Sequence, residues 1–430
     1  MTMDFDDFFY YHAGIYTFRV IQMNTVTIKT TAKFSPWILW TVAVGFVLFQ
    51  FFLQLSSGVL VNALISEYKL SALGAGILTS SYYYIYFVLQ IPVGVLLDKY
   101  GSRLLLTLGA LGCALGCICF ANAHTLWTAI ISRLLMGGGA AFAFVGLLHV
   151  IRDNFALRRY AFMVGLAEAV GLIGSIIGTI GLAIVLKSYG WRLLLTEFGC
   201  LGIVIAFCCW YFLPNKQPHE ETVKFSLQDL RKVLFDKTAW LNGVFIGLLF
   251  SIITVFAALW APSFLQIKLA TNLTMASSLS ALIFLGAAIA CPLFGQLDAV
   301  LERKRHALMQ FSAISTTILF LILLYAPITN PLFCGLLVLA IGVCCSSYML
   351  SFAITDEIAP TGLKSTYTGF TNTLAVISAP ILQPLVGFLI DNFSKNDGHD
   401  LIAYQKGLLI MPLFLLCGAL IVFFLPKQRC

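Results

Sequence analysis

Twelve long apolar segments, separated by short polar ones, dominate this sequence of 430 residues. A helix needs about 20 apolar residues to cross the ~30 Å hydrocarbon core of a bilayer. A transmembrane β-barrel is excluded, because its strands alternate apolar and polar residues, whereas these segments are continuously apolar. The composition agrees, with 60% hydrophobic and 10% charged residues. We therefore predict an all-α polytopic membrane protein with twelve transmembrane helices, at residues 36–62, 71–97, 104–122, 125–150, 160–186, 193–213, 239–265, 273–297, 307–328, 332–355, 366–391 and 404–425.

Residues 214–238 form the longest hydrophilic segment, and six predicted helices lie on each side of it. Within it, Leu227, Leu230 and Leu234 recur at helical spacing, which predicts a short amphipathic helix at the membrane surface. The predicted organisation is an N-terminal extension at 1–35, a six-helix half at 36–213, a loop at 214–238, a second six-helix half at 239–425 and a tail at 426–430.

Lysine and arginine are distributed unequally between alternate polar segments. Of the 26 basic residues, nineteen lie on the side of the N-terminus, six lie on the opposite side, and Arg133 lies within a predicted helix. Because cytoplasmic loops carry the excess of positive charge, both termini are predicted to be cytoplasmic. The formal net charge of +7 follows from this bias and requires no nucleic-acid partner.

The sequence offers no metal site and no enzyme active site. Of its twelve cysteines, those that cluster lie in apolar segments without accompanying His, Asp or Glu, where a free cysteine packs as a small hydrophobe. A nucleophile–base constellation and a Gly-rich phosphate loop are also missing. We therefore expect no metal, no cofactor and no enzymatic activity. The first 22 residues do not resemble a signal peptide, and both Met1 and Met23 remain candidate starts.

Two motifs combine charge with glycine. Residues 94–103, between the second and third predicted helices, read GVLLDKYGSR, and a degenerate copy, GQLD at 295–298, lies between the eighth and ninth. In the fourth helix, Arg133 is followed by a glycine-rich stretch at 137–141. This set resembles the signatures of the major facilitator superfamily of transporters. The resemblance implies two pseudo-symmetric six-helix halves and secondary active transport by alternating access.

The same resemblance implies a latch that joins the two halves while the extracellular side is open. Gly94 would allow close helix approach, and the Asp98 carboxylate would face the positive end of the eleventh helix dipole, near residues 365–366. Arg103 would pair with Asp153 at the end of the fourth helix. The candidate latch residues are Gly94, Asp98, Gly101, Arg103 and Asp153.

Further segments narrow the resemblance. They include YYIYFVLQIPVGVLLDKYG at 83–101, AFAFVG at 141–146, GWR at 190–192 and GFTN at 369–372. These segments resemble the Pht family of phagosomal nutrient transporters from intracellular proteobacteria and, more loosely, lysosomal dipeptide carriers. The resemblance implies uptake of amino acids across a bacterial inner membrane, with dipeptides and nucleosides as neighbouring substrates. We expect a monomer.

Polar residues within the apolar segments mark a candidate substrate site. Gln50 and Gln54 lie one turn apart, as do Tyr82 and Tyr86, so each pair shares one face of its helix. Arg133 is a charge inside the bilayer, which is costly and functional by default, and it would meet a substrate carboxylate. The second half offers neutral polar groups. The candidate substrate-binding residues are Arg133, Gln50, Gln54, Tyr82, Tyr86, Ser347 and Asn372.

Glu168, on the fifth predicted helix, is a second charge within an apolar segment. Arg133 and Glu168 lie near opposite faces of the membrane, and a rise of 1.5 Å per residue leaves roughly 15 Å between them in depth. We therefore predict no direct ion pair. Glu168 is the candidate for proton coupling, and the alternative interpretation is a side chain that reaches toward the inner interface.

Other functions remain open at this point. The main prediction is uptake of a small, zwitterionic nutrient, with the lipid bilayer, the solute and protons as partners. One alternative is export of a siderophore-like or drug-like molecule. Another is a non-transporting membrane sensor on the same fold.

Overall fold

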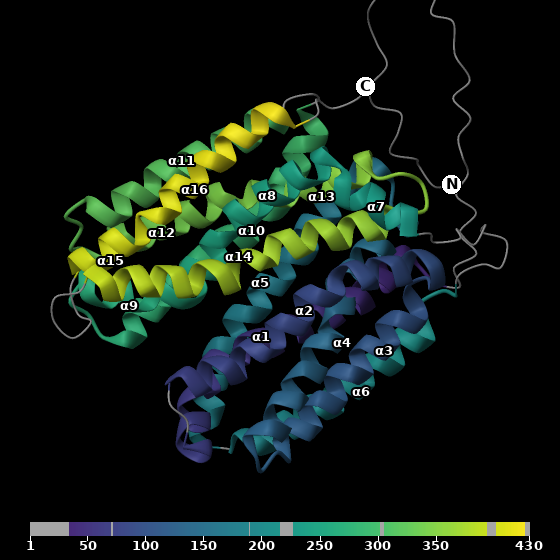
Figure 1. Cartoon of the computed structure of the whole chain (residues 1–430), viewed down its shortest axis with the longest axis horizontal. Coiled ribbons are helices and arrows are strands. Elements are labelled where there is room, and N and C mark those ends of the chain that lie inside the picture. The colour runs from purple at the N-terminus through teal and green to yellow at the C-terminus, as the bar shows by residue number, and fades with distance from the viewer. Residues whose placement is uncertain are drawn as a thin grey trace, which may run out of the picture. The chain divides into compact units, whose positions relative to one another are not determined.

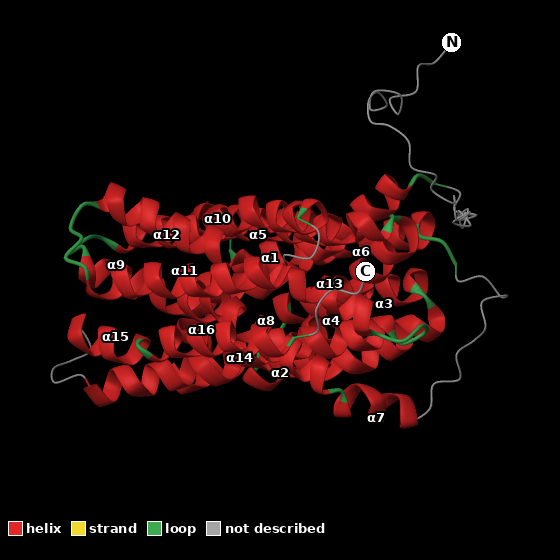
Figure 2. Cartoon of the chain, turned by 90° about the horizontal axis from the view of Figure 1, so that it is seen from above, coloured by secondary structure: helices red, strands yellow, loops and turns green. Residues whose placement is uncertain are grey.

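The computed structural model describes residues 34–69, 72–188, 190–215, 227–301, 305–393 and 401–425. These residues are almost entirely helical (Figures 1 and 2). Eleven stretches of them are long and apolar enough to cross a membrane, and α2 (Ala72–Tyr100) adds a further helix of 29 residues. The prediction of an all-α polytopic membrane protein is confirmed. Residues 1–33, 216–226 and 426–430 of the predicted extension, loop and tail lie outside the described residues.

Six long helices make up the N-terminal half, and a short helix follows them. The N-terminal half consists of α1 (Pro36–Tyr68), α2, α3 (Ser102–Ala121), α4 (Leu126–Asn154), α5 (Leu157–Ser188) and α6 (Trp191–Phe212). Helix α7 (Leu227–Phe235) forms where the leucine spacing predicts a short helix.

The C-terminal half also contains six helical rods, but three of them are interrupted. The seventh predicted span is α8 (Lys237–Ser251), a π-helix at Ile252–Trp260 and α9 (Ala261–Lys268). The tenth is α12 (Pro331–Cys345), a 3₁₀ turn at Ser346–Met349 and α13 (Leu350–Ile358). The others are α10 (Leu273–Val300), α11 (Arg305–Tyr325), α14 (Lys364–Phe393), and the last rod, α15 (Leu401–Leu408) with α16 (Ile410–Ile421) and a 3₁₀ turn at Val422–Phe424.

These interruptions differ from the continuous helices predicted from the sequence. A run that is apolar throughout satisfies an α-, π- or 3₁₀-helical period equally well, so hydropathy does not reveal where the winding changes. Local changes of winding inside α-helices often occur at functional sites. The two longest interruptions, at 252–260 and 346–349, lie beside the cavity that is described below.

Successive helices run in opposite directions, so their connections fall at two levels. The level that contains the α2–α3, α4–α5 and α13–α14 connections is called the Asp98 end, since Asp98 contacts Ser365 there. The opposite level contains the α3–α4 and α5–α6 connections and is called the Arg192 end, because Arg192 bonds Ala123 there. Helix α7 lies at the Asp98 end, and α9 and α15 lie at the other (Figures 1 and 2).

Close packing of α3 against α4 depends on the glycine-rich stretch predicted as a signature. A Cβ atom at Gly139 would meet the Gly109 carbonyl oxygen and would lie 2.6 Å from the Cys113 backbone nitrogen. At neighbouring Gly138, the nearest atom to an added Cβ is Leu89 Cδ1, at an ordinary 3.6 Å. Small residues of this kind allow helix backbones to approach closely in membranes.

We predict that Gly139→Ala destabilises the protein and that Gly138→Ala does not. Overpacking against α3 should lower the free energy of unfolding by about 1–3 kcal/mol. Both changes exchange glycine for alanine in the same helix, a gain of up to about 1 kcal/mol in propensity, so the difference isolates packing. Thermal unfolding of both variants in lipid nanodiscs measures it, and equal melting temperatures would contradict the prediction.

Candidate functional site

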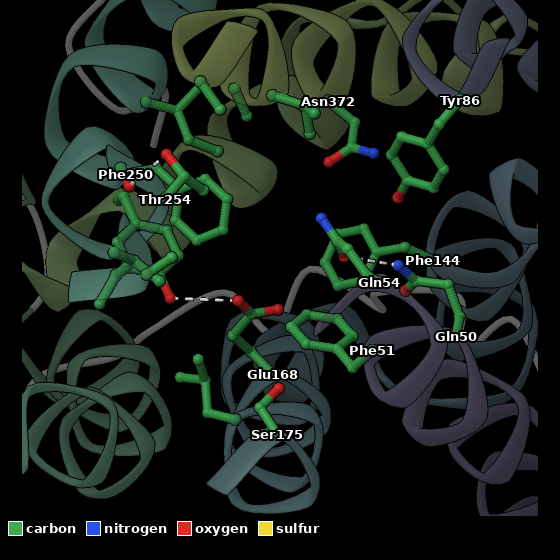
Figure 3. Close-up of a pocket in the computed structure, with 18 of the residues that line it drawn as sticks. Gln50, Phe51, Gln54, Tyr86, Phe144, Glu168, Ser175, Phe250, Thr254 and Asn372 are labelled. Atoms are coloured by element: carbon green, nitrogen blue, oxygen red, sulfur yellow. Dashed lines mark hydrogen bonds between the residues drawn. The ribbon is translucent and has the colours of Figure 1, made fainter. Parts of the chain in front are cut away.

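A cavity lies between the two halves (Figure 3), and its empty space of about 810 Å³ includes solvent at its opening. Both halves contribute to its wall, through α1, α2, α4 and α5 on one side and α8, the π-helix, α10, the 346–349 turn, α13 and α14 on the other. Its polar lining residues are Gln50, Gln54, Tyr83, Tyr86, Glu168, Ser175, Thr254, Tyr348, Asn372 and Gln383.

Amide groups gather on one side of the cavity. Gln50 Nε2 donates to Gln54 Oε1 at 2.8 Å and lies 3.4 Å from the Tyr82 hydroxyl. Tyr86 and Asn372 lie close to this pair in Figure 3. Gln50 is 1% exposed, and its Oε1 has no hydrogen-bond partner among the described residues. This side of the cavity therefore holds a buried acceptor that has no partner among the described residues.

Glu168 lies on the opposite side of the cavity and bonds across the two halves. Its side chain is buried, and the Tyr348 hydroxyl donates to Oε1 at 3.2 Å. The second carboxylate oxygen lies on the cavity side of this bond (Figure 3). Tyr348 belongs to the 346–349 turn, so the interruption of the tenth rod positions this contact. The thiol of Cys291 in α10 lies 3.5 Å from the same hydroxyl.

Three of the predicted binding residues do not line the cavity. Arg133 is 3% exposed, and it donates to the Leu53 carbonyl at 3.5 Å. Its guanidinium lies 5.1 Å from the centroid of the Tyr82 ring, which is itself fully buried. Ser347 donates to Ser312 Oγ at 2.6 Å, away from the cavity wall. Backbone carbonyl and ring contacts hold the arginine one layer behind the cavity.

The other predicted residues come together as the lining of one cavity. Gln50, Gln54, Tyr86 and Asn372 all belong to its wall, as does Glu168. Glu168 bonds the Tyr348 hydroxyl, whereas Arg133 bonds the Leu53 carbonyl. Sequence reasoning missed Tyr83, Ser175 and Gln383, whose helical positions give no signal that distinguishes them from ordinary polar contacts between helices.

Asp98 makes the predicted contact with the start of α14. Its carboxylate accepts from the Ser365 and Thr366 backbone amides at 3.0 and 2.8 Å, and from Thr366 Oγ1 at 2.8 Å. A carboxylate at a helix N-terminus is stabilised by the free amides and the helix dipole. At Gly94, an added Cβ would lie 2.8 Å from Thr366 Cα, and Gly101 has a φ of 76°, which favours glycine in this turn.

The predicted pair between Arg103 and Asp153 is not formed. Arg103 instead places its guanidinium 4.4 Å from the Trp210 ring centroid on α6. Asp153 lies 3.2 Å from Nε2 of His149, one turn earlier on the same helix. The prediction was wrong because an aromatic face on a neighbouring helix binds the arginine, and a histidine in the same helix binds the carboxylate.

A buried ion pair between the halves was not anticipated from the sequence. Arg152 Nε lies 2.5 Å from Asp356 Oδ1, and the Asp356 side chain is 1% exposed. Lys364 Nζ approaches the second carboxylate oxygen at 2.8 Å. Arg152 also donates to Ser365 Oγ at 3.1 Å and to Thr368 Oγ1 at 3.2 Å. Arg152, Asp356 and Lys364 all lie near helix ends, where sequence alone does not show which charges meet.

Comparison with known proteins identifies the family. The family model described as Major Facilitator Superfamily matches residues 42–382. The chain belongs to the Major Facilitator Superfamily. The similar proteins with named activities are transporters rather than enzymes, which agrees with the two-half architecture around a central cavity.

Several curated transporters are similar to parts of the chain. The probable L-galactonate transporter of Escherichia coli (strain K12) is 29% identical over 239 residues, covering 51% of this chain and 52% of that protein. The riboflavin transporter RibZ of Clostridioides difficile (strain 630) is 28% identical over 137 residues, or 32% of this chain and 30% of that protein. The chain spans about half the length of the first of these relatives and less of the second.

Two solved transporters of the superfamily share the fold. The Escherichia coli fucose:proton symporter FucP has a TM-score of 0.67 at 16% identity, covering 90% of this chain and all of that one. The proton:xylose symporter XylE has a TM-score of 0.71 at 13% identity, covering 92% of this chain and 96% of that one. At these identities the likeness concerns the fold alone.

We predict that Asp356→Asn opens the Asp98 end of this superfamily member. The change leaves the Arg152 guanidinium in a mostly buried site without its main counter-charge, at a cost of up to about 3–5 kcal/mol. Asp153→Asn is the matched control, because the Asp153 side chain is 54% exposed. Spin labels on the exposed residues Leu157 and Val300 report the separation of α5 and α10 by electron paramagnetic resonance.

The distance distribution should shift to longer values in Asp356→Asn and stay unchanged in Asp153→Asn. An unchanged distribution in both variants would show that the ion pair does not hold this end together.

Proposed function

We propose that this protein is a secondary active transporter that imports a small nutrient by alternating access, with Glu168 as the proton-coupling group. The observation that carries the proposal is the bond between Glu168 in α5 and Tyr348 in the C-terminal half, at the wall of the cavity. A proton on this carboxyl and a solute in the same cavity would each influence how the two halves meet.

Burial gives the proton a physical role. An ionised carboxylate in a site of low polarity costs free energy unless it is paired with an opposite charge. Glu168 has a neutral hydroxyl as its partner instead. Uptake of a proton would remove that cost, and it would allow the occupied cavity to pass through a state closed to water on both sides. Both solved structures named above are of proton symporters.

We propose that the Asp98 end faces the cytoplasm, with both termini on that side of a bacterial inner membrane. The excess of lysine and arginine at this level supports the orientation. Asp98, Arg152 and Asp356 join the halves at this end, which corresponds to a transporter closed toward the cytoplasm. In this orientation a solute would reach the cavity from outside, as import requires.

For the substrate site we propose Gln50, Gln54, Tyr86 and Asn372. Their amides and hydroxyl supply donors and acceptors from both halves, which suits a solute that must hold the halves together on occlusion. The resemblance to nutrient carriers of the Pht family and to lysosomal dipeptide carriers makes amino acids and dipeptides the first solutes to test. The named solutes of the relatives differ among themselves: L-galactonate and riboflavin.

We predict that Glu168→Gln abolishes accumulation driven by a proton gradient but leaves equilibrative exchange. Glutamine keeps the size and the hydrogen bond to Tyr348 while removing the titratable group. Uptake of labelled amino acids, dipeptides and thymidine into proteoliposomes, with and without an inward proton gradient, measures the effect. The matched control is Glu197→Gln, an exposed carboxyl on α6.

If the wild-type protein accumulates solute equally with and without the proton gradient, proton coupling is contradicted. If none of the solute classes is taken up, an exporter or a sensor is favoured instead.

We further predict that Asn372→Ala weakens uptake and that Ser347→Ala does not. Asn372 lines the cavity, whereas Ser347 bonds Ser312 behind it. Loss of one hydrogen bond should raise the KM about three- to tenfold. The uptake assay in proteoliposomes provides the comparison. A larger effect from Ser347→Ala than from Asn372→Ala would show that the substrate site lies outside the cavity.

A further inference from the structure

The cavity is nearly free of charge. Among the described residues that line it, Glu168 is the one carboxylate, and no lysine, arginine or histidine is present. Arg133, a basic group inside the N-terminal half, lies against the fully buried Tyr82 ring and donates to a backbone carbonyl. From the described residues of the wall itself, a solute therefore meets one negative charge at most and no positive charge.

The groups that face Glu168 do not change the net charge of the cavity. Tyr348 donates to it from the 346–349 turn, and the Cys291 thiol of α10 lies behind that hydroxyl. Tyr86 of α2 lines the cavity from the other side. All three side chains are neutral in the physiological range. Glu168 alone decides whether the empty cavity carries a charge.

Two oxygens of the cavity lining favour a solute that carries hydrogen-bond donors. Gln50 Oε1 is buried without a partner, and the second oxygen of Glu168 lies on the cavity side of its bond to Tyr348. A solute that fits these atoms carries hydroxyl, amide or ammonium donors. An isolated carboxylate on the solute would bring acceptors to acceptors and would lie near the Glu168 charge.

The rest of the wall is aromatic and apolar. Phe250 packs on the Tyr348 ring with centroids 4.8 Å apart, and Phe144 of the N-terminal half meets Phe352 of the C-terminal half at 5.2 Å. Phe51 and Phe284 complete this surface. An apolar or aromatic portion of a solute gains free energy from burial here.

From this chemistry we propose that the substrate is a net-neutral molecule with hydrogen-bond donors at one end and an apolar portion at the other, and that organic anions are excluded. The proposal rests on the proposed function: one proton neutralises Glu168, so the solute must bring no net charge of its own. An occluded cavity is then neutral as a whole. Zwitterions such as amino acids and dipeptides satisfy the condition, whereas sugar acids do not.

Two matched series of probes test the charge rule by binding to the purified protein in nanodiscs. The first is phenylalanine, N-acetylphenylalaninamide and N-acetylphenylalanine, which share a ring and differ in net charge. The second is L-galactose and L-galactonate. We expect net-neutral members of the phenylalanine series to bind at least about tenfold more tightly than the anion, because like charges repel in a site of low dielectric. L-galactonate should bind no better than L-galactose.

The Glu168→Gln variant shows whether discrimination between the probes depends on the Glu168 charge or on the shape of the cavity. It removes the negative charge, so the discrimination against N-acetylphenylalanine should shrink to within about threefold, while Glu197→Gln keeps the wild-type ratio. Anions that bind wild-type protein as tightly as their neutral counterparts would overturn the proposal, as would failure of every net-neutral probe to bind. Gradient-driven accumulation of an anion would overturn it too, yet would leave proton-coupled transport standing.

Discussion

The lipid core imposes the constraint on which the rest of this structure depends: every backbone polar group and every charge inside it needs a partner within the protein. Helices satisfy the backbone internally, so twelve apolar segments become twelve helical rods. Few charges are left inside, and they are held: Arg133 by a carbonyl and an aromatic ring, and Glu168 by a tyrosine hydroxyl. The cavity between the halves has the same scarcity of charge, and Glu168 is the one carboxylate among the described residues that line it.

At the Asp98 end, the bonds between the halves are strong enough to define one conformation and weak enough to break. Asp98 accepts three hydrogen bonds at the start of α14, and Arg152 joins Asp356 in a buried pair. Each hydrogen bond to a charged group contributes about 1.5–3 kcal/mol net, because water replaces it when it breaks. Opening this end would hydrate both carboxylates and the free amides of α14. A latch of several modest bonds therefore suits a transporter that must open repeatedly.

Sequence reasoning succeeded where the residue types are compatible with only one structure or contact. The apolar runs predict helices, and the resemblance of the 94–103 loop to the superfamily signature implies the contact of Asp98 with Ser365 and Thr366. It failed where several partners compete. Asp153 was the expected partner of Arg103, but the aromatic ring of Trp210 on α6 binds it. Arg133 was expected in the substrate site, but a straight-helix picture does not show which side chains stand in front of it.

The interruptions in the helices determine which side chains reach the cavity, and the sequence alone does not reveal these interruptions. Hydropathy treats 332–355 as one helix, yet the 3₁₀ turn at Ser346–Met349 changes the direction of successive side chains and brings Tyr348 to Glu168. The same turn directs Ser347 away, to Ser312 in α11. Tyr348 therefore occupies a segment whose winding differs from its neighbours and contacts the one carboxyl of the cavity wall. Hydrogen-bond geometry is poorer in a 3₁₀ turn than in an α-helix, so Tyr348 contacts Glu168 from the less stable part of this rod.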